Sequence, residues 1–210
     1  MKISIGSNFT ENPYGGGNLF VKNITSYLLS ENDQDINHLK DPDIDIILLI
    51  NPLRNSEQAT FNNYDIDYYL NFKNNNALSI QRVNECDQRK NTTGVNKKII
   101  KSNKFIDHTV YVSSWLRDLF LNEGIGGRKN SVIYAGANEN SFNTKDKIFW
   151  DGSRKIKLVT HHWSSNPMKG WIDYKKVDEI LNDLKWRNKL EFTFIGNLSK
   201  NQKFKNTKVI

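Results

Sequence analysis

The chain has 210 residues, of which 37% are hydrophobic and 11% aromatic, so it can bury a real core in one large or two small domains. Its net charge of +7 permits an acidic partner such as nucleic acid, an anionic membrane surface or a phosphorylated substrate. The single cysteine excludes an internal disulfide, and the sequence contains no run of about 18 apolar residues that could span a membrane. We therefore expect a cytoplasmic protein.

An apolar strand at residues 2–6 opens the chain, and a polar loop then leads to Gly15, Gly16 and Gly17. Glycines before a helix let backbone N–H groups approach a phosphate or a sugar closely, because no Cβ intervenes. The third glycine of the dinucleotide fingerprint is missing, since Phe20 holds its place, and an NAD-dependent dehydrogenase is therefore disfavoured. Apolar residues then recur at helical spacing, at Leu19, Phe20, Ile24, Tyr27 and Leu28.

Several short apolar segments predict further strands of the same sheet. Residues 43–50 end in a continuous apolar run, which is typical of a parallel strand covered on both faces. The other expected strands are residues 77–80, 107–112 and 131–134.

Helices are expected between these strands. Residues 55–76 show no clear pattern, although three tyrosines fit a helix that packs on the sheet. Residues 95–105 predict a helix with apolar residues on its inner face, and residues 115–122 predict a second helix, capped by Ser114 and ended by Gly124. The tyrosines are Tyr64, Tyr68 and Tyr69, and the inner residues of the second segment are Ile99, Ile100 and Phe105.

A dense polar group follows the strand at residues 77–80. Arg82 can grip a phosphate or a carboxylate, and Asn84 can hydrogen-bond sugar hydroxyls. Glu85 or Asp87 can accept a proton or a hydroxyl hydrogen bond. A solvent-exposed loop with internal salt bridges is the alternative.

Residues 155–196 read as one strand, loop, helix and strand. Apolar residues around Leu158 and Phe194 mark the strands, and helical spacing runs from Trp171 to Leu184. A parallel sheet places the polar loop between them at the carboxyl end of the first strand, where such sheets bind ligands. Lys169 lies just before the helix, where the dipole favours an anion, although an ordinary polar loop remains the alternative.

This segment resembles the start of the nucleotide-sugar-binding domain of GT-B glycosyltransferases of the retaining, family 4 type. In that family the lysine of a Lys-Gly pair contacts the donor diphosphate, and Lys169-Gly170 match the pair. The usual Gly-Arg pair about six residues earlier is replaced here by His162-Trp163. The resemblance implies donor contacts at Lys169, Gly170, Ser164, Ser165, Asn166 and His162.

The first part of the chain resembles the same family. Residues 82–87 are similar to an Arg-x-Asn-(Glu/Asp)-Cys-Asp stretch, and residues 135–138 with Phe142 hold the places of an Asn-Gly-Val-Asp loop and its later Phe. In the family a glycine-rich loop after the first strand faces the interdomain cleft. The resemblance implies cleft or acceptor-side residues at Gly15, Gly16, Gly17, Arg82, Asn84 and Asp87.

The predicted fold is therefore α/β and GT-B-like: a Rossmann-like parallel-sheet domain at residues 1–142, a linker at 143–154 and the start of a second Rossmann-like domain at 155–210. About sixty residues of a domain that needs about 150 are present, and the family's late glutamate pair has no counterpart, so no catalytic residue is assigned. The alternatives are a fragment of a longer enzyme and a degenerate half-domain. For a fragment we expect transferase activity only in the full-length protein, no activity from these 210 residues alone, and weak hydrogen-exchange protection of residues 155–210.

The resemblance implies transfer of a sugar, with retention, from a nucleotide-sugar donor to a glycan, lipid or small-molecule acceptor. It also implies no cofactor, no obligatory metal and no nucleic-acid partner. The residues agree for the metal, since His161 and His162 are adjacent and no Cys/His cluster is present. The charge is compatible with peripheral membrane contact, and self-association is compatible with the small second domain. The alternative is a non-catalytic basic α/β module that binds a nucleotide or nucleic acid. It requires exposed aromatics beside the lysines of residues 97–104, and the sequence offers none next to them.

Overall fold

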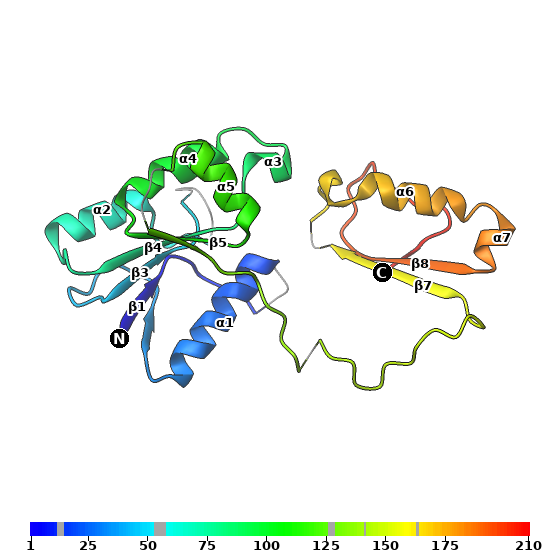
Figure 1. Ribbon diagram of the computed structural model, residues 1–210, viewed down its shortest axis with the longest axis horizontal. Coiled ribbons are helices and arrows are strands. Elements are labelled where there is room, and N and C mark those ends of the chain that lie inside the picture. Colours follow the sequence, from blue (N-terminus) through cyan, green and yellow to red (C-terminus); the bar gives the residue numbers. More distant parts are fainter. Residues whose placement is uncertain (12–14, 53–57, 126–128, 141, 163) are drawn as a thin grey trace. The chain divides into compact units, whose positions relative to one another are not determined.

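The computed structural model describes residues 1–11, 15–52, 58–125, 129–140, 142–162 and 164–210. Trp163 of the polar loop and the first part of the unclear segment, residues 55–57, lie outside these ranges. The chain divides into two compact units, Met1–Gly136 and Ala137–Ile210, each built from a parallel sheet with helices. Figure 1 shows the elements of both units.

The first unit contains a six-stranded sheet in the order β2-β1-β3-β4-β5-β6, with every neighbouring pair parallel. The predicted α/β, Rossmann-like class with a parallel sheet is confirmed. Strand order reverses between β1 and β3, so the carboxyl ends of these two strands flank the switch point at which open parallel sheets bind ligands. The strands are β1 (Lys2–Ile5), β2 (Gln34–Ile36), β3 (Ile46–Leu49), β4 (Leu78–Val83), β5 (His108–Tyr111) and β6 (Lys129–Val132).

Helices cover both faces of this sheet (Figure 1). Helix α1 (Gly16–Ser30) lies on one face, and α2 (Asn63–Phe72), α4 (Val95–Ser102) and α5 (Ser114–Asn122) lie on the other. Two short elements, α3 (Asp87–Lys90) and the 3-10 turn η1 (Asn103–Phe105), complete the connections.

Strand β3 shows why two layers form. Ile47 and Leu49 are buried against the α2 layer, whereas Leu48 belongs to the cluster under α1. Successive side chains of a strand point to opposite faces, so a continuous apolar run supplies both layers. The expectation that this strand is covered on both faces is confirmed.

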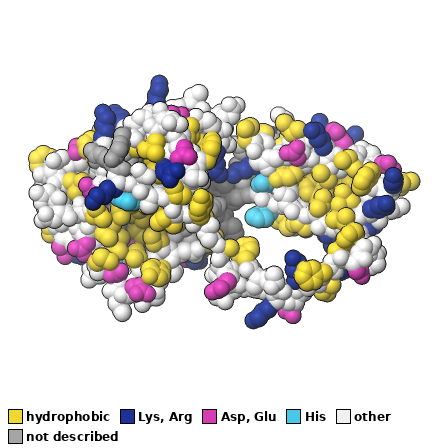
Figure 2. Space-filling model, viewed as in Figure 1, with side chains coloured by type: hydrophobic (Ala, Val, Ile, Leu, Met, Phe, Trp, Pro, Cys, Tyr) yellow, Lys and Arg dark blue, Asp and Glu magenta, His cyan; other side chains and the backbone are white. Residues whose placement is uncertain are grey.

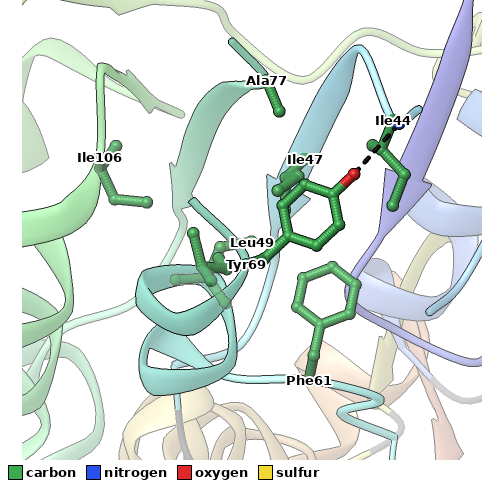
Figure 3. Packing of buried hydrophobic residues seen from close by; sticks show 8 residues of the cluster. Ile44, Ile47, Leu49, Phe61, Tyr69, Ala77 and Ile106 are labelled. Atoms are coloured by element: carbon green, nitrogen blue, oxygen red, sulfur yellow. Dashed lines mark hydrogen bonds between the residues drawn. The ribbon is translucent and has the colours of Figure 1, made fainter. Parts of the chain in front are cut away.

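Tyr69 fastens α2 to the segment that precedes β3 (Figure 3). Its ring is fully buried, and its hydroxyl accepts a hydrogen bond from the Ile44 N–H at 3.1 Å. The same hydroxyl donates to the Asp41 carbonyl at 2.8 Å. A buried tyrosine needs a partner for its O–H, and here that requirement also sets the position of the helix.

A buried polar network joins β4 and β5 to the end of α4. The Gln81 amide donates to the Ser102 hydroxyl at 2.8 Å, and the Asn103 amide donates to Gln81 Oε1 at 3.0 Å and to Thr109 Oγ1 at 2.7 Å. All four side chains are buried. Because the side-chain amides of Gln81 and Asn103 donate to acceptors within the network, their burial carries only a small free-energy penalty.

The second unit has a three-stranded parallel sheet, β7-β8-β9, and a single layer of helices. Aromatic side chains fill the space between α6 and the sheet, with Phe194 3% exposed and its ring 5.5 Å from that of Phe204. Figure 2 shows hydrophobic side chains at the surface of this unit between α6 and the strands. Its elements are β7 (Ile156–His162), η2 (Pro167–Lys169), α6 (Trp171–Ile180), α7 (Leu184–Arg187), β8 (Leu190–Gly196) and β9 (Lys208–Val209).

Some element boundaries differ from the expected ones for local reasons. The helix expected from Trp171 to Leu184 ends at Ile180, because Asp183 accepts a hydrogen bond from the Lys185 N–H and starts α7. The cap of α5 is Ser113, not Ser114, since its hydroxyl accepts from the Leu116 N–H.

Three further differences concern the first sheet. Strand β4 continues to Val83, β6 covers residues 129–132 instead of 131–134, and the edge strand β2 was not expected. Strand β2 is short and partly polar, so it carries no apolar signal, and pairing with β1 alone defines it.

The described residues between β6 and β7, 133–140 and 142–155, form no helix or strand and are exposed. Within the described part of the chain, no helix is both long enough and apolar enough to cross a membrane.

Candidate functional site

The loop between β7 and α6 has a defined backbone. The Asn166 side chain accepts a hydrogen bond from the Met168 N–H at 2.9 Å, and Pro167 starts the 3-10 turn that carries Lys169. Gly170 then turns the chain into α6 with φ 97°, a left-handed conformation that favours glycine. A Cβ on Gly170 would also meet the Tyr174 ring at 3.0 Å. Both constraints explain why a glycine follows Lys169 at this helix start.

The loop side chains predicted to bind a donor come together in one small hollow. Its volume is only about 10 Å³, so a ligand here would lie over the loop and the start of α6 and not inside a closed cavity. The sequence spacing placed these residues in one loop, and the structure shows that they also share one surface. The hollow is lined by His162, Ser164, Ser165, Asn166 and Lys169 together with Trp171, Tyr174, Phe194, Asn197 and Gln202.

The electrostatics of this loop favour an anion. Lys169 is exposed, and none of the ion pairs among the described residues includes it. No side chain caps the first turn of α6, although Asp173 adds one negative charge there. The start of a helix carries partial positive charge, so the lysine and the dipole act in the same direction.

His162 is held in place by a neighbour on α6. Its Nε2 lies 2.6 Å from the Tyr174 hydroxyl, which also accepts a hydrogen bond from Thr160 at 3.0 Å. Burial lowers the pKa of His162, and the positive charges of Lys169 and His161 lower it further. The imidazole is therefore neutral near pH 7 and offers a hydrogen bond, not a second cation, to a bound group.

The glycine segment of the first unit leads directly into α1. Gly15 has φ 89° and precedes the first helical residue, Gly16, and the first turn has neither a side-chain cap nor an acidic residue. A Cβ at Gly15, Gly16 or Gly17 would have no described atom within 4 Å. Only Gly15 is required by backbone conformation, and no described side chain caps this helix start.

Arg82 lies close to α1. It sits in β4, and its guanidinium stacks on the Phe20 ring at 3.9 Å from the ring centroid. Its Nη1 is buried without a hydrogen-bond partner among the described residues, and burial lowers the pKa of this guanidinium. A buried, unpaired donor on a cation is costly, and an anionic group would satisfy it.

Asp87 caps the start of α4. Its carboxylate accepts hydrogen bonds from the N–H groups of Gly94, Val95 and Asn96 at 3.0–3.1 Å and from the Thr92 hydroxyl at 2.9 Å. Burial alone would raise the pKa of Asp87, but these hydrogen bonds outweigh it and the pKa is lowered. The carboxylate thus starts α4 and has little capacity left for an acceptor.

The neighbours of Asp87 are also paired within the segment. Glu85 pairs with Lys90, and the Asn84 carbonyl accepts from Arg89 at 2.9 Å. The polar group expected to follow the strand at residues 77–80 is thus divided, since Arg82 belongs to β4 and Asp87 caps α4. The Glu85–Lys90 pair is an internal salt bridge of the kind that the alternative interpretation expected. Of the polar group, Arg82 and the side chain of half-buried Asn84 remain as candidates.

One lysine of α4 lies over an exposed aromatic ring of α2, which corrects in part the expectation that no aromatic side chain would lie next to these lysines. Tyr64, Tyr68 and Phe72 follow one face of α2 and are exposed. The Lys101 ammonium lies over the Tyr64 ring at 5.3 Å, and the Tyr68 and Phe72 rings are 5.0 Å apart. The sequence shows that these three aromatic residues are spaced four apart, but it does not show that Tyr64 lies next to Lys101 of α4.

Asn18 is a further residue that the sequence did not single out. It is buried in the first turn of α1, where its amide accepts from the Thr10 N–H at 2.7 Å and donates to the Thr10 carbonyl at 2.8 Å. These two bonds fix the loop after β1 against the helix start. An asparagine directly after three glycines was the available signal.

Within the described residues, no three His, Cys, Asp or Glu side chains are grouped so that they could hold a metal ion. No family model matches the chain, and no curated protein matches it.

Proposed function

We propose that this chain binds the diphosphate of a nucleotide sugar at the β7–α6 loop and belongs to a retaining glycosyltransferase of GT-B type. The observation that carries the proposal is the position of Lys169, exposed and without an ion pair among the described residues, immediately before the uncapped start of α6. A cation and a helix N-terminus together are the usual means of binding a phosphate without a metal.

The loop supplies the neutral contacts that such a group needs. Ser164, Ser165 and Asn166 line the same hollow as Lys169 and offer hydroxyl and amide donors. His162, held by Tyr174, adds an imidazole whose lowered pKa keeps it uncharged. In a transfer reaction, Lys169 and the helix dipole would offset the charge that develops on the leaving diphosphate.

The first unit supplies the acceptor side in this proposal. Arg82 brings a half-buried cation, whose Nη1 has no partner among the described residues, to the face of the sheet covered by α1, and Gly15 turns the chain into that helix. Asn84 adds an amide after the end of β4. These groups suit a glycan, lipid or small-molecule acceptor with hydroxyls and an anionic substituent.

The test is calorimetric titration of the 210-residue chain with UDP- and GDP-sugars. Lys169→Ala should weaken binding by roughly 1.5–3 kcal/mol, the range for a charge-assisted contact. Lys176→Ala is the matched control, because it removes the same charge from an exposed position further along α6. Equal losses in both variants, or no binding by the parent chain, would contradict the proposal.

One observation favours a second candidate function, binding of single-stranded nucleic acid. Tyr64, Tyr68 and Phe72 form an exposed aromatic row, and Lys101 lies over its first ring. Stacking platforms flanked by cations bind single strands, with about 1–3 kcal/mol per stacked base. Asp65 and Asp67 on the same helix oppose it. Salt-dependent binding of oligonucleotides that Tyr68→Ala weakens, with Lys169→Ala unchanged, would favour this function over sugar transfer.

A further inference from the structure

A cavity of about 320 Å³ lies in the first unit, between α1 and the edge of the sheet formed by β1 and β2. It opens near the carboxyl ends of these strands, and its size is at the lower end of the range for small-molecule sites. None of the described residues of the β7–α6 loop lines it. Its walls are Ile5, Ser7, Asn8, Phe9, Val21, Thr25, Asp35, Ile36 and Asn37.

Asp35 is the ionisable side chain of this cavity. It pairs with Ile3 across β1 and β2, and Ile3 belongs to the cluster under α1, so Asp35 faces the same side. Its Oδ1 is buried and has no hydrogen-bond partner among the described residues. Burial raises the pKa of Asp35, and a hydrogen bond with Thr25 offsets only part of that rise. A buried carboxylate oxygen without a donor is costly, and a hydrogen-bond donor on a ligand would offset that cost.

The other polar groups of the cavity are neutral amides and hydroxyls. The Asn37 amide donates to Asn8 Oδ1 at 2.8 Å, which ties the loop after β1 to the end of β2. That bond uses one donor of Asn37 and one acceptor of Asn8, and each amide has further capacity. Ser7 and Thr25 add hydroxyls, and the half-exposed ring of Phe9 adds an apolar wall.

We propose that this cavity binds a neutral, hydroxyl-rich molecule of about the size of one sugar ring, with a ligand hydroxyl donating to Asp35 Oδ1. A ligand with several hydroxyls can engage the carboxyl, both amides and the Thr25 hydroxyl at once, whereas a simple cation would satisfy Asp35 alone. The site lies within the first unit and requires neither Lys169 nor sugar transfer.

The experiment is an amide-resolved NMR titration of the 210-residue chain with D-glucose, D-galactose and D-mannose, and with D-glucosamine as the cationic analogue. At least one neutral sugar should cause saturable shifts at the amides of Ser7, Asn8, Asp35 and Asn37. Asp35→Asn should weaken that binding about tenfold or more, as for other hydrogen bonds to a charged group. Asp118→Asn, which alters an exposed carboxylate on α5, should leave it unchanged.

A second measurement separates binding from structure. Without ligand, Asp35→Asn should keep or raise the melting temperature, because it removes the charge of a carboxylate whose buried Oδ1 has no hydrogen-bond partner among the described residues. A lower melting temperature would assign Asp35 a structural role and overturn the proposal. So would the lack of saturable shifts with all three neutral sugars, or shifts with glucosamine only. Lys169→Ala should leave the neutral-sugar titration unchanged. A failure of the cavity proposal can therefore be distinguished from a failure of the nucleotide-sugar proposal.

Discussion

The two units contain similar apolar strands but bury them differently. In the first unit Ile47 and Leu49 of β3 are fully buried, with strands on both sides and helices on both faces. In the second unit Ile156 and Leu158 of β7 are 41% and 40% exposed although their strand partners face α6. A strand at the edge of a sheet under one helix buries less area than a central strand between two layers, whatever its composition.

This comparison predicts that the second unit depends on a few aromatic contacts, whereas the first distributes its stability over three clusters. Substitutions in the second unit should therefore unfold it locally, and similar substitutions in the first should be tolerated better.

Phe194→Ala should have the largest effect. Phe194 is buried against Tyr174 and Phe204, and removal of such a ring typically costs about 3–5 kcal/mol. Hydrogen exchange should show loss of protection in β7 and β8 with β3 and β4 unchanged. Ile195→Ala is the matched control, because the neighbouring side chain points to the other face and is partly exposed, and it should cost less than about 1 kcal/mol.

Gly196→Ala tests the close approach of two strands in the second unit. Gly196 has φ 130°, and a Cβ there would collide with the His162 carbonyl oxygen. We expect a loss on the order of 3 kcal/mol from combined backbone strain and overpacking, measured as lower protection of the second unit. Gly136→Ala should be neutral, since Gly136 has open space around it and no positive φ. A neutral Gly196→Ala would show that the strands can separate there without loss.

Tyr69→Phe tests how much one buried hydroxyl contributes to the stability of the first unit. The change leaves the Ile44 N–H and the Asp41 carbonyl without their partner, which should cost about 1–3 kcal/mol. Denaturant unfolding monitored on the first unit should report the loss, and the unit should remain folded because its other two clusters are intact. Tyr68→Phe, at the exposed neighbour, should change stability by less than about 0.5 kcal/mol.

Asp178 should give the second unit a small acid sensitivity. Burial alone would raise the pKa of Asp178, but hydrogen bonds from the Lys205, Asn206 and Thr207 N–H groups and the Thr207 hydroxyl outweigh it, and the pKa is lowered below 3.8. A carboxyl with a depressed folded pKa contributes stability above its unfolded value and loses it as pH falls through the folded one.

The corresponding experiment compares unfolding midpoints of the second unit between pH 5 and pH 2.5. The parent should lose stability across this range more steeply than Asp178→Asn, which has no charge to lose. Equal slopes would mean that the loop at residues 205–207 does not depend on this carboxylate in solution.

Much of the fold could be predicted from apolar patterns. The apolar run ending at Ile50 indicated a strand covered on both faces, and the helical spacing of apolar residues after Gly170 indicated α6. Both predictions were possible because the buried side chains of one element recur at a regular spacing within a short stretch of sequence. Strand β2 could not be predicted, since its polar residues carry no such signal and only pairing with β1 defines it.

The candidate sites divide in the same way. Lys169, Gly170 and the loop before them could be placed at a helix start, because the chain connects them directly. Three other features could not be predicted, since each depends on contacts between separate elements. They are the capping of α4 by Asp87, the stacking of Arg82 on Phe20 and the unpaired oxygen of Asp35.

The amino-acid sequence was enough to place the strands and helices with a clear apolar pattern, the helix end at Gly124 and the loop that presents Lys169. The contacts between elements were needed to learn which polar groups have partners within the protein and which do not. The physical reason is that propensity and periodicity act within a few residues, whereas the pairing of a buried donor or acceptor is settled by the element packed against it. Asp87 and Asp35 are both acids at the edge of short elements, yet one caps α4 with both oxygens and the other faces a cavity with one oxygen unpaired.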